Sequence, residues 1–374
     1  MRTILPIVAA LLCLPSFAQT TAPKARKDGP ETSPKPAIPV YEVALAEDTN
    51  YPSIPWTTDG NSDLADGACD GDGNLYVLRP GRGLVGLTSN GVVSFLVDKM
   101  TDISSPSTTF LGLKPSVSSS GISFMVVGIE KKDAEAGATN VATDREGHEH
   151  TMHSYIVRFD KDGTYKGAIR VDDLPFIVYK FAAFESGNLV AQGLDHNDVP
   201  RIGLLDSAGQ FLRYLELRKD ISTVQAASPE DIKCNDCTAD VRSAVFSSWF
   251  TPWRGKMLFS RALSNSPRVY EIQEGGAIRV VSIRPPEGYG GGGLLPSDGN
   301  WLMSFSNPAG VASLFEVDPQ NGKLLAEYRI KPPDKPRDTV LSCYFDGEFW
   351  GLRHDTKGGK LRVVRGAPQP YRGK

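Results

Sequence analysis

Three histidines lie within one short polar stretch, DREGHEHTMHSY, which spans residues 144–155 of a chain that contains only five histidines. They are His148, His150 and His153. Neutral imidazole is the commonest transition-metal ligand in proteins. Two histidines separated by one residue in an extended chain point to the same side, so His148 and His150 could share zinc or another divalent ion, with His153 as third ligand. Three protein ligands and one open position are typical of a catalytic zinc site.

The other two histidines and three acidic residues extend this hypothesis. His196 and His354 occur in the polar stretches GLDHNDVP and GLRHDTKGG, and either is an alternative third ligand. Glu149, Asp195 or Asp355 would then act as a base or as the hydrogen-bond partner of a ligating histidine. No standard motif such as HExxH is present. The sequence therefore favours the alternative that these histidines belong to solvated loops and bind no metal.

A repeated pattern identifies the elements that must position these residues. It consists of an apolar stretch, a glycine-containing turn and an alternating apolar strand, as in DGDGNLYVLR (residues 70–79) and PSDGNWLMSF (residues 296–305). Asp-Gly and Ser-Gly turns between alternating apolar residues predict β-hairpins. The pattern occurs six times, with its turn glycines at Gly73, Gly121, Gly187, Gly255, Gly299 and Gly347.

A third apolar strand follows each hairpin, and a fourth follows in every unit but the last. Repetition of a four-stranded unit six times predicts an all-β fold, a six-bladed β-propeller. The last unit lacks its fourth strand, while VYEVALAE, residues 40–47, is a spare strand at the other end. We therefore expect residues 40–47 to pair with the last blade and close the ring, which removes exposed sheet edges.

The Asp-Gly-Asn turn before a Leu-Tyr-Val strand, followed by an Asp-x-x-Gly turn, resembles the NHL-repeat family and related six-bladed propellers. The resemblance covers nearly all of the chain after the first 39 residues and implies the propeller fold. Propellers host many activities. Six-bladed families include metal-dependent lyases and lactonases, but their metal ligands cannot be matched residue by residue to this sequence.

Two polar insertions lengthen the spacing between turn glycines to 66 and 68 residues, against 44 to 48 elsewhere. One covers residues 130–153, between the second and third strands of blade 2, and the other covers residues 220–240, between blades 3 and 4. Loops of this length are usually functional or disordered. Loops between strands 2 and 3 lie on the same face of a propeller as the connections between blades. All five histidines and both insertions therefore map to one face, where we expect ligands to bind.

Four cysteines remain outside the N-terminal apolar stretch. In an oxidising compartment, Cys234 and Cys237 of the sequence CNDC are expected to form a local disulfide, with a redox pair as the alternative. Cys69 and Cys343 hold equivalent positions in blades 1 and 6, where a disulfide would lock the closed ring. Other blades hold ordinary packing residues at this position, and neighbouring inner strands are expected to lie too far apart for bridging. The sequence therefore favours two buried thiols.

Two further sequence features resemble ligand-binding sites, but a structural role explains each of them. DGDGN, residues 70–74, lacks the remainder of a calcium-binding loop, so a hairpin turn accounts for it. Trp249 and Trp253 lie in SSWFTPWRG beside a strand end, and we expect them to pack between blades rather than stack on a ligand.

The N-terminus reads as a secretory signal peptide. Arg2 precedes an apolar stretch that is too short to span a bilayer, and Ser16 and Ala18 are the small residues of a cleavage site after Ala18. The expected organisation is a signal peptide (1–18), a disordered tether rich in Pro, Lys, Ser and Thr (19–39), the propeller (40–368) and a C-terminal tail (369–374). We expect a secreted or periplasmic monomer.

Composition narrows the function classes. The formal net charge of −3 provides no basic surface for nucleic acid, and no membrane span is expected. The first hypothesis is an extracytoplasmic binding module for a small molecule, a glycan or an envelope protein. The alternative is a metal-dependent lyase or hydrolase with a histidine-rich site on the loop-bearing face, for which zinc or another divalent metal would be the cofactor.

Overall fold

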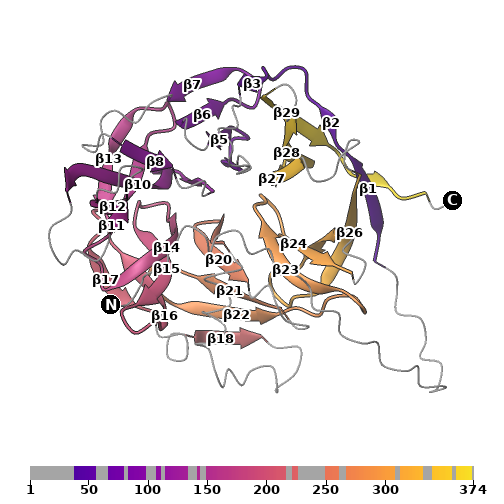
Figure 1. The fold of residues 1–374 in the computed structure, drawn as a ribbon. Helices are drawn as coiled ribbons and strands as arrows, with labels where there is room; N and C mark the ends of the chain where they lie inside the picture. Colours follow the sequence, from indigo (N-terminus) through magenta and orange to yellow (C-terminus); the bar gives the residue numbers. More distant parts are fainter. Residues whose placement is uncertain are drawn as a thin grey trace.

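Six β-sheets arranged in a ring form the fold in the computed structural model of the protein (Figure 1). The structure describes residues 38–55, 66–79, 83–97, 107–110, 114–133, 141–143, 149–215, 221–225, 249–260, 267–307, 312–331, 339–355 and 359–372. All regular elements in these ranges are strands. The described residues contain no helix that is long and apolar enough to cross a membrane. The prediction of an all-β, six-bladed propeller is confirmed.

Each sheet is one blade, and the blades follow the order of the chain. Blade 1 contains β4 (Asp66–Cys69), β5 (Leu75–Arg79), β6 (Gly83–Leu87) and β7 (Val93–Val97). Blade 2 contains β9 (Ser116–Ser118), β10 (Gly121–Asp133), β12 (Glu149–Phe159) and β13 (Tyr165–Arg170), with β8 (Ser107–Phe110) and β11 (Val141–Thr143) beside them. Blade 3 contains β14 (Phe176–Ala183), β15 (Leu189–Asp195), β16 (Pro200–Leu205) and β17 (Phe211–Tyr214).

The second half of the ring is built in the same way. Blade 4 contains β19 (Thr251–Trp253), β20 (Lys256–Ser260), β21 (Arg268–Ile272) and β22 (Ile278–Ser282), with β18 (Ile221–Gln225) parallel to β22. Blade 5 contains β23 (Gly290–Leu295), β24 (Trp301–Ser306), β25 (Ala312–Val317) and β26 (Leu324–Lys331). Blade 6 contains β27 (Thr339–Phe345), β28 (Glu348–Asp355) and β29 (Lys360–Gly366).

The turn between β4 and β5 shows why these sequences form hairpins. Asp70 Oδ1 accepts hydrogen bonds from the backbone N–H groups of Asp72 and Asn74, each at 3.0 Å. Gly73 has a φ of 77°, a conformation that side chains disfavour. A Cβ atom on Gly73 would lie 2.7 Å from the Phe345 ring of blade 6. The same glycine therefore forms the turn and lets blade 6 pack against blade 1.

The apolar core consists of six clusters, one between each pair of neighbouring blades. Successive side chains of a strand point to opposite faces of its sheet, so each blade contributes to two clusters. The cluster between blades 6 and 1 contains Trp350 and Leu75, together with Tyr51 and Ile54 from the N-terminal segment. The first and last blades are therefore joined by the same kind of packing as the other pairs.

The N-terminal segment closes the ring, as predicted, but it spans two blades. β2 (Ala46–Glu47) and β3 (Ile54–Pro55) pair antiparallel with β29 of blade 6, where the fourth strand is missing. β1 (Val40–Ala44) instead pairs parallel with β26 of blade 5. β30 (Gln369–Pro370), at the start of the predicted tail, pairs with β1.

Ion pairs hold this closing segment on blade 6. The Glu47 carboxylate accepts hydrogen bonds from Arg353, at 2.6 Å, and from Arg362. Asp48 accepts a hydrogen bond from Arg365 at 3.0 Å. These side chains are about one-third exposed or less, so the ion pairs supplement the burial of apolar side chains rather than replace it.

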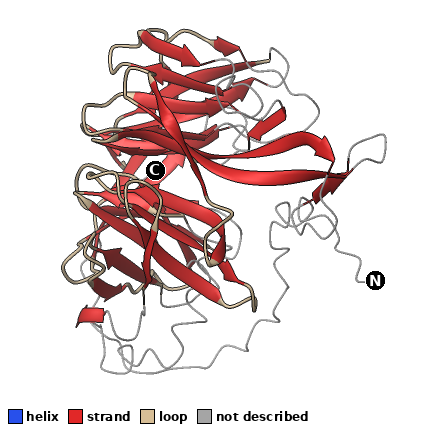
Figure 2. Ribbon diagram, turned by 90° about the vertical axis from the view of Figure 1, so that its left-hand side faces the viewer, coloured by secondary structure: helices blue, strands red, loops and turns tan. Residues whose placement is uncertain are grey.

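The insertion in blade 2 is built partly of strands, although its polar sequence predicted a loop. β10 and β12 stay paired beyond the blade, with Gly128 opposite His153 and Ile129 opposite Met152. β8 pairs with this extension of β10, and β11 pairs with β12. Figure 2 shows the two long strands projecting from one side of the ring. Within the second insertion, β18 covers the outer strand of blade 4.

Candidate functional site

The connections between strands lie on two opposite faces of the propeller. The turns between strands 1 and 2 and between strands 3 and 4 of each blade lie on one face, here named the turn face, and the remaining connections lie on the opposite loop face. Interactions at the turn face join successive blades around the ring: Lys161 to Asp70, Ser119 to Glu185, Asn188 to Glu274, Trp253 to Gly299, and Asp346 to Asp298. The turn face is therefore largely committed to holding the blades together.

Asp70 shows that the DGDGN turn is one of these structural contacts. Its Oδ2 atom accepts hydrogen bonds from Asn74 at 3.1 Å and Tyr76 at 3.0 Å, and the Lys161 ammonium of blade 2 lies 3.0 Å away. Burial alone would raise the pKa of Asp70, but the hydrogen bonds from Asn74 and Lys161 outweigh it and hold this pKa below its usual value. The Lys161 ammonium therefore balances the charge of this carboxylate, and DGDGN forms the hairpin turn that the sequence predicted.

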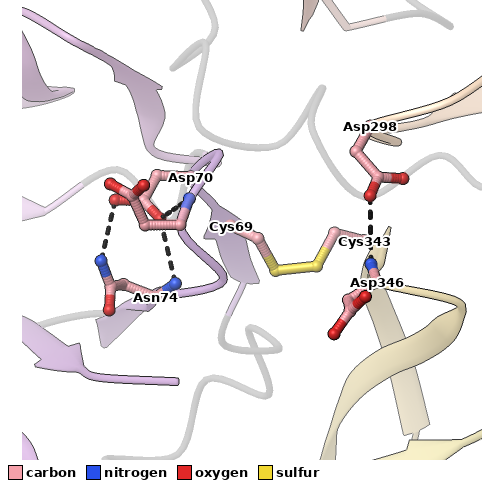
Figure 3. The surroundings of a disulfide bond; sticks show 7 residues. Cys69, Asp70, Asn74, Asp298, Cys343 and Asp346 are labelled. Atoms are coloured by element: carbon pink, nitrogen blue, oxygen red, sulfur yellow. Dashed lines mark hydrogen bonds between the residues drawn. A yellow bond between two sulfur atoms is a disulfide. The ribbon is translucent and has the colours of Figure 1, made fainter.

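A disulfide between Cys69 and Cys343 joins blade 1 to blade 6, with 6.1 Å between the Cα atoms (Figure 3). The expectation of two buried thiols is wrong. It assumed that neighbouring inner strands stay too far apart, but Gly67 lets β4 approach β27. A Cβ atom on Gly67 would lie 2.9 Å from Ser342 Oγ. The signal in the sequence was the equivalent position of the two cysteines relative to Gly73 and Gly347.

A small cavity of about 40 Å³ lies where the inner strands of blades 1 to 5 meet. This is room for a few ordered waters. Among the described residues its lining is mainly apolar, with Lys114 as the one charged residue: Ala68, Cys69, Lys114, Pro115, Ser116, Val117, Phe181, Trp249, Phe250, Pro252 and Pro296.

Lys180, on the inner strand β14, is a functional candidate that sequence reasoning missed. Its side chain is buried, and its Nζ atom lies 4.6 Å from the centre of the Trp249 ring, which lines the central cavity. Burial lowers the pKa of Lys180 from 10.5 to about 8. The signal available in the sequence was a lysine inside the otherwise apolar strand FIVYKFAA.

This lowered pKa predicts a pH dependence of stability. Between pH 8 and 10.5 the unfolded chain holds the Lys180 proton and the folded chain releases it, so folding is favoured as pH rises through this window. Relative to a Lys180→Met variant, the wild-type protein should gain up to about 3 kcal/mol of unfolding free energy across it. Urea unfolding of both proteins at several pH values measures the gain. A difference that does not change with pH would contradict the assignment.

The two tryptophans of SSWFTPWRG pack between blades, as expected. Trp253 lies in the cluster between blades 4 and 5, and its Nε1–H donates to the Gly299 carbonyl at 2.9 Å. Trp249 packs against the cluster between blades 2 and 3 and also lines the central cavity. Trp249 therefore contacts both the Lys180 ammonium group and the cavity.

His153 lies in β12, where the long hairpin leaves blade 2. Its side chain is buried, and Nδ1 lies 2.6 Å from Asp172 Oδ2. Asp172 also accepts hydrogen bonds from the Ser154 backbone N–H, at 2.8 Å, and from Arg170 Nε, at 3.0 Å. A carboxylate on one imidazole nitrogen accompanies many metal-ligating histidines, but it equally satisfies a buried histidine without a metal.

His196 is exposed in the connection between β15 and β16 of blade 3. The neighbouring Asp195 holds this turn, because its Oδ1 atom accepts the backbone N–H groups of Asn197 and Val199 at 2.9 and 3.0 Å. Its Oδ2 atom accepts Arg201 Nε at 2.9 Å. Burial acts to raise the pKa of Asp195, but these hydrogen bonds keep it below its usual value. These contacts give Asp195 a structural role in the turn and make its carboxylate a weaker base.

The remaining predicted residues lie in blade 6, at the start of β12 in blade 2, or outside the described residues. His354 is buried in β28 opposite Leu361, and Asp355 ends that strand. Glu149 and His150 begin β12. His148, Cys234 and Cys237 lie outside the described residues.

The described histidine side chains therefore come from three different blades. Within the described ranges, no three His, Cys, Asp or Glu residues form a group that could hold a metal ion. The histidine-rich metal site stays a prediction, because His148 is not among those residues.

The similarity of this chain to known proteins is limited to solved structures with low sequence identity. No protein-family model matches the sequence, and no curated protein is similar to it. Trypanosoma rangeli sialidase is similar in structure, with 12% sequence identity, a TM-score of 0.40, and coverage of 87% of this chain and 59% of the sialidase. RS223-Beta-xylosidase shows 14% identity and a TM-score of 0.33, covering 70% of this chain and 95% of that chain. This chain thus matches less than two thirds of the sialidase, and the blade count rests on the sheets themselves.

Proposed function

We propose that this protein is an extracytoplasmic binding module whose ligand binds on the loop face. The observation that carries the proposal is the commitment of the turn face to contacts between blades. The described cavity at the inner strands has room for a few waters, and the proposal places the ligand on the surface loops. The long hairpin of β10 and β12 extends blade 2 beyond its neighbours and adds surface for such a ligand.

The proposed compartment follows from chemistry and from the N-terminal sequence. A disulfide fits an oxidising environment outside the cytoplasm. The signal peptide, its cleavage after Ala18 and the NHL-repeat relationship are part of the proposal. The ligand class is a small molecule, a glycan or an envelope protein, and the proposed state is a monomer.

The second candidate function is a metal-dependent lyase or hydrolase. The observation that favours it is the hydrogen bond between His153 and Asp172, 2.6 Å long, which has the form of a ligand–carboxylate pair in metal sites. This function further requires His148 and His150, or a histidine of another blade, to approach His153.

Photo-crosslinking tests the preferred function by comparing the two faces. A photoreactive amino acid is placed at His196, exposed on the loop face, or at Gln320, exposed in a turn on the turn face. Each protein is secreted by its native cells and irradiated there. We expect discrete adducts from position 196 and none from position 320. Equal labelling from both positions, or adducts from position 320 alone, would contradict a binding site on the loop face.

A further inference from the structure

The outer edges of the blades differ in how they are protected. Parallel strands cover the fourth strands of two blades, since β18 lies on β22 and β1 lies on β26. In blade 6, β2 and β3 lie on β29. Among the described residues, no strand pairs with the outer edges of β7, β13 and β17. Open sheet edges attract further strands unless charges or proline block them.

Two of these open edges carry charges and the third does not. β13 contains Lys166 and Arg170, and β17 contains Arg213. β7 has the sequence VSFLV, with neither a charged residue nor proline. The edge of blade 1 therefore lacks the residues that normally prevent strand addition.

The exposed side chains of β7 are apolar as well. Val93 is 43% exposed and Leu96 is 51% exposed, and the adjoining Val92 is 62% exposed. Phe95 and Val97 face the other way and pack against the cluster between blades 1 and 2. β7 therefore packs against the neighbouring blade through Phe95 and Val97 and exposes Val93 and Leu96 to solvent, and no described strand pairs with its outer edge.

We propose that β7 binds an extended segment of a partner protein as a parallel fifth strand of blade 1. The propeller already accepts such strands twice, each five residues long and parallel to the fourth strand. Their sequences, VYEVA and ISTVQ, are rich in β-branched residues. The partner segment should resemble them, with backbone hydrogen bonds supplying affinity and alternate apolar side chains meeting Leu96 and Val93.

The size of the edge favours a peptide segment over a second copy of the whole chain. A strand of five residues is roughly 17 Å long. Two propeller rims that meet along one such strand would bury less than the roughly 1,200 Å² of a stable interface. A flexible segment can instead follow the edge and pair along its full length.

Peptide selection and amide exchange test this inference independently of the proposed loop-face ligand. A random-peptide phage library is selected on the immobilised mature protein, and the selected peptides are then tested by hydrogen–deuterium exchange. We expect peptides rich in β-branched residues, like β1 and β18, that slow exchange in residues 93–97. Leu96→Lys should weaken their binding about tenfold or more.

Leu212→Lys is the matched control, because Leu212 is 57% exposed on β17, the corresponding strand of blade 3. It should leave peptide binding and the melting temperature unchanged, and Leu96→Lys should also keep the melting temperature. The inference is overturned if no selected peptide slows exchange in residues 93–97, or if both variants act alike. It is also overturned if sedimentation shows a dimer that Leu96→Lys dissociates, because the occupant would then be a second copy.

Discussion

Replacing Cys69 and Cys343 by alanine is expected to lower the free energy of unfolding by about 2–5 kcal/mol. The disulfide joins residues separated by 274 positions, and closing so long a loop restricts the unfolded chain strongly in the chain-entropy account. It also joins inner strand β4 of blade 1 to inner strand β27 of blade 6, which come from opposite ends of the propeller sequence. Denaturant unfolding of the oxidised wild-type protein and the variant measures this loss.

Reductant supplies the control for this prediction. In a background in which Cys234 and Cys237 are serines, only the Cys69–Cys343 bond should respond to reductant. Reduction should reproduce most of the alanine variant's loss, and the remainder reports the packing of the removed sulfur atoms. Free thiols at both positions in the unreduced protein, or stability that is indifferent to reductant, would contradict the closure role.

Removal of the closing segment is expected to have a still larger effect. A mature chain that begins after Pro55 lacks β1, β2 and β3, and with them the buried side chains of Val43, Leu45, Tyr51 and Ile54. At about 1.5–3 kcal/mol for each buried side chain, the loss is about 6–12 kcal/mol, comparable with the whole stability of a typical domain. We expect aggregation or the loss of cooperative thermal unfolding, measured by circular dichroism and size-exclusion chromatography.

A shorter truncation is the matched control. A chain that begins at Ile38 lacks the Pro-, Lys-, Ser- and Thr-rich segment but retains the closing strands and the hydrogen bond from Glu327 N–H to the Pro39 carbonyl. Its melting temperature should equal that of the mature protein. If both truncations unfold cooperatively at the same temperature, ring closure by the N-terminal segment contributes nothing to stability.

The fold was predictable because local chemistry specifies each hairpin. The turn at Gly73 needs a positive φ and an aspartate that accepts backbone N–H groups, and both requirements are visible in the sequence DGDGN. Alternating apolar residues then specify which faces of each blade are buried. The count of strands also predicted closure by the N-terminus. The strand count did not predict that Val40–Ala44 would pair with β26 of blade 5 before the chain reaches blade 6.

Long-range distances were not predictable from these local patterns. The approach of Cys69 to Cys343 depends on Gly67 lying against Ser342, a contact between the two ends of the ring. The lowered pKa of Lys180 likewise depends on burial by distant parts of the chain. Such distances follow from the closed ring and not from the neighbouring residues in sequence.

The polar insertion of blade 2 illustrates a different limit. Its composition predicted a loop, but β10 and β12 continue their pairing outward from the blade, with β8 beside β10 and β11 beside β12. The prediction that the histidines share one face follows from strand order. Whether three imidazoles converge depends on side-chain positions in this outward hairpin, and the sequence does not specify those.

Metal content is the most direct test of whether this protein binds a ligand without metal chemistry. The mature protein, purified without a tag or chelator, is examined by elemental analysis before and after incubation with zinc. It is compared with His148→Ala/His150→Ala/His153→Ala and with His196→Ala. We expect no stoichiometric transition metal in any of them, with His153 hydrogen-bonded to Asp172. About one equivalent of zinc that the triple variant loses would contradict it and establish the metal-dependent alternative.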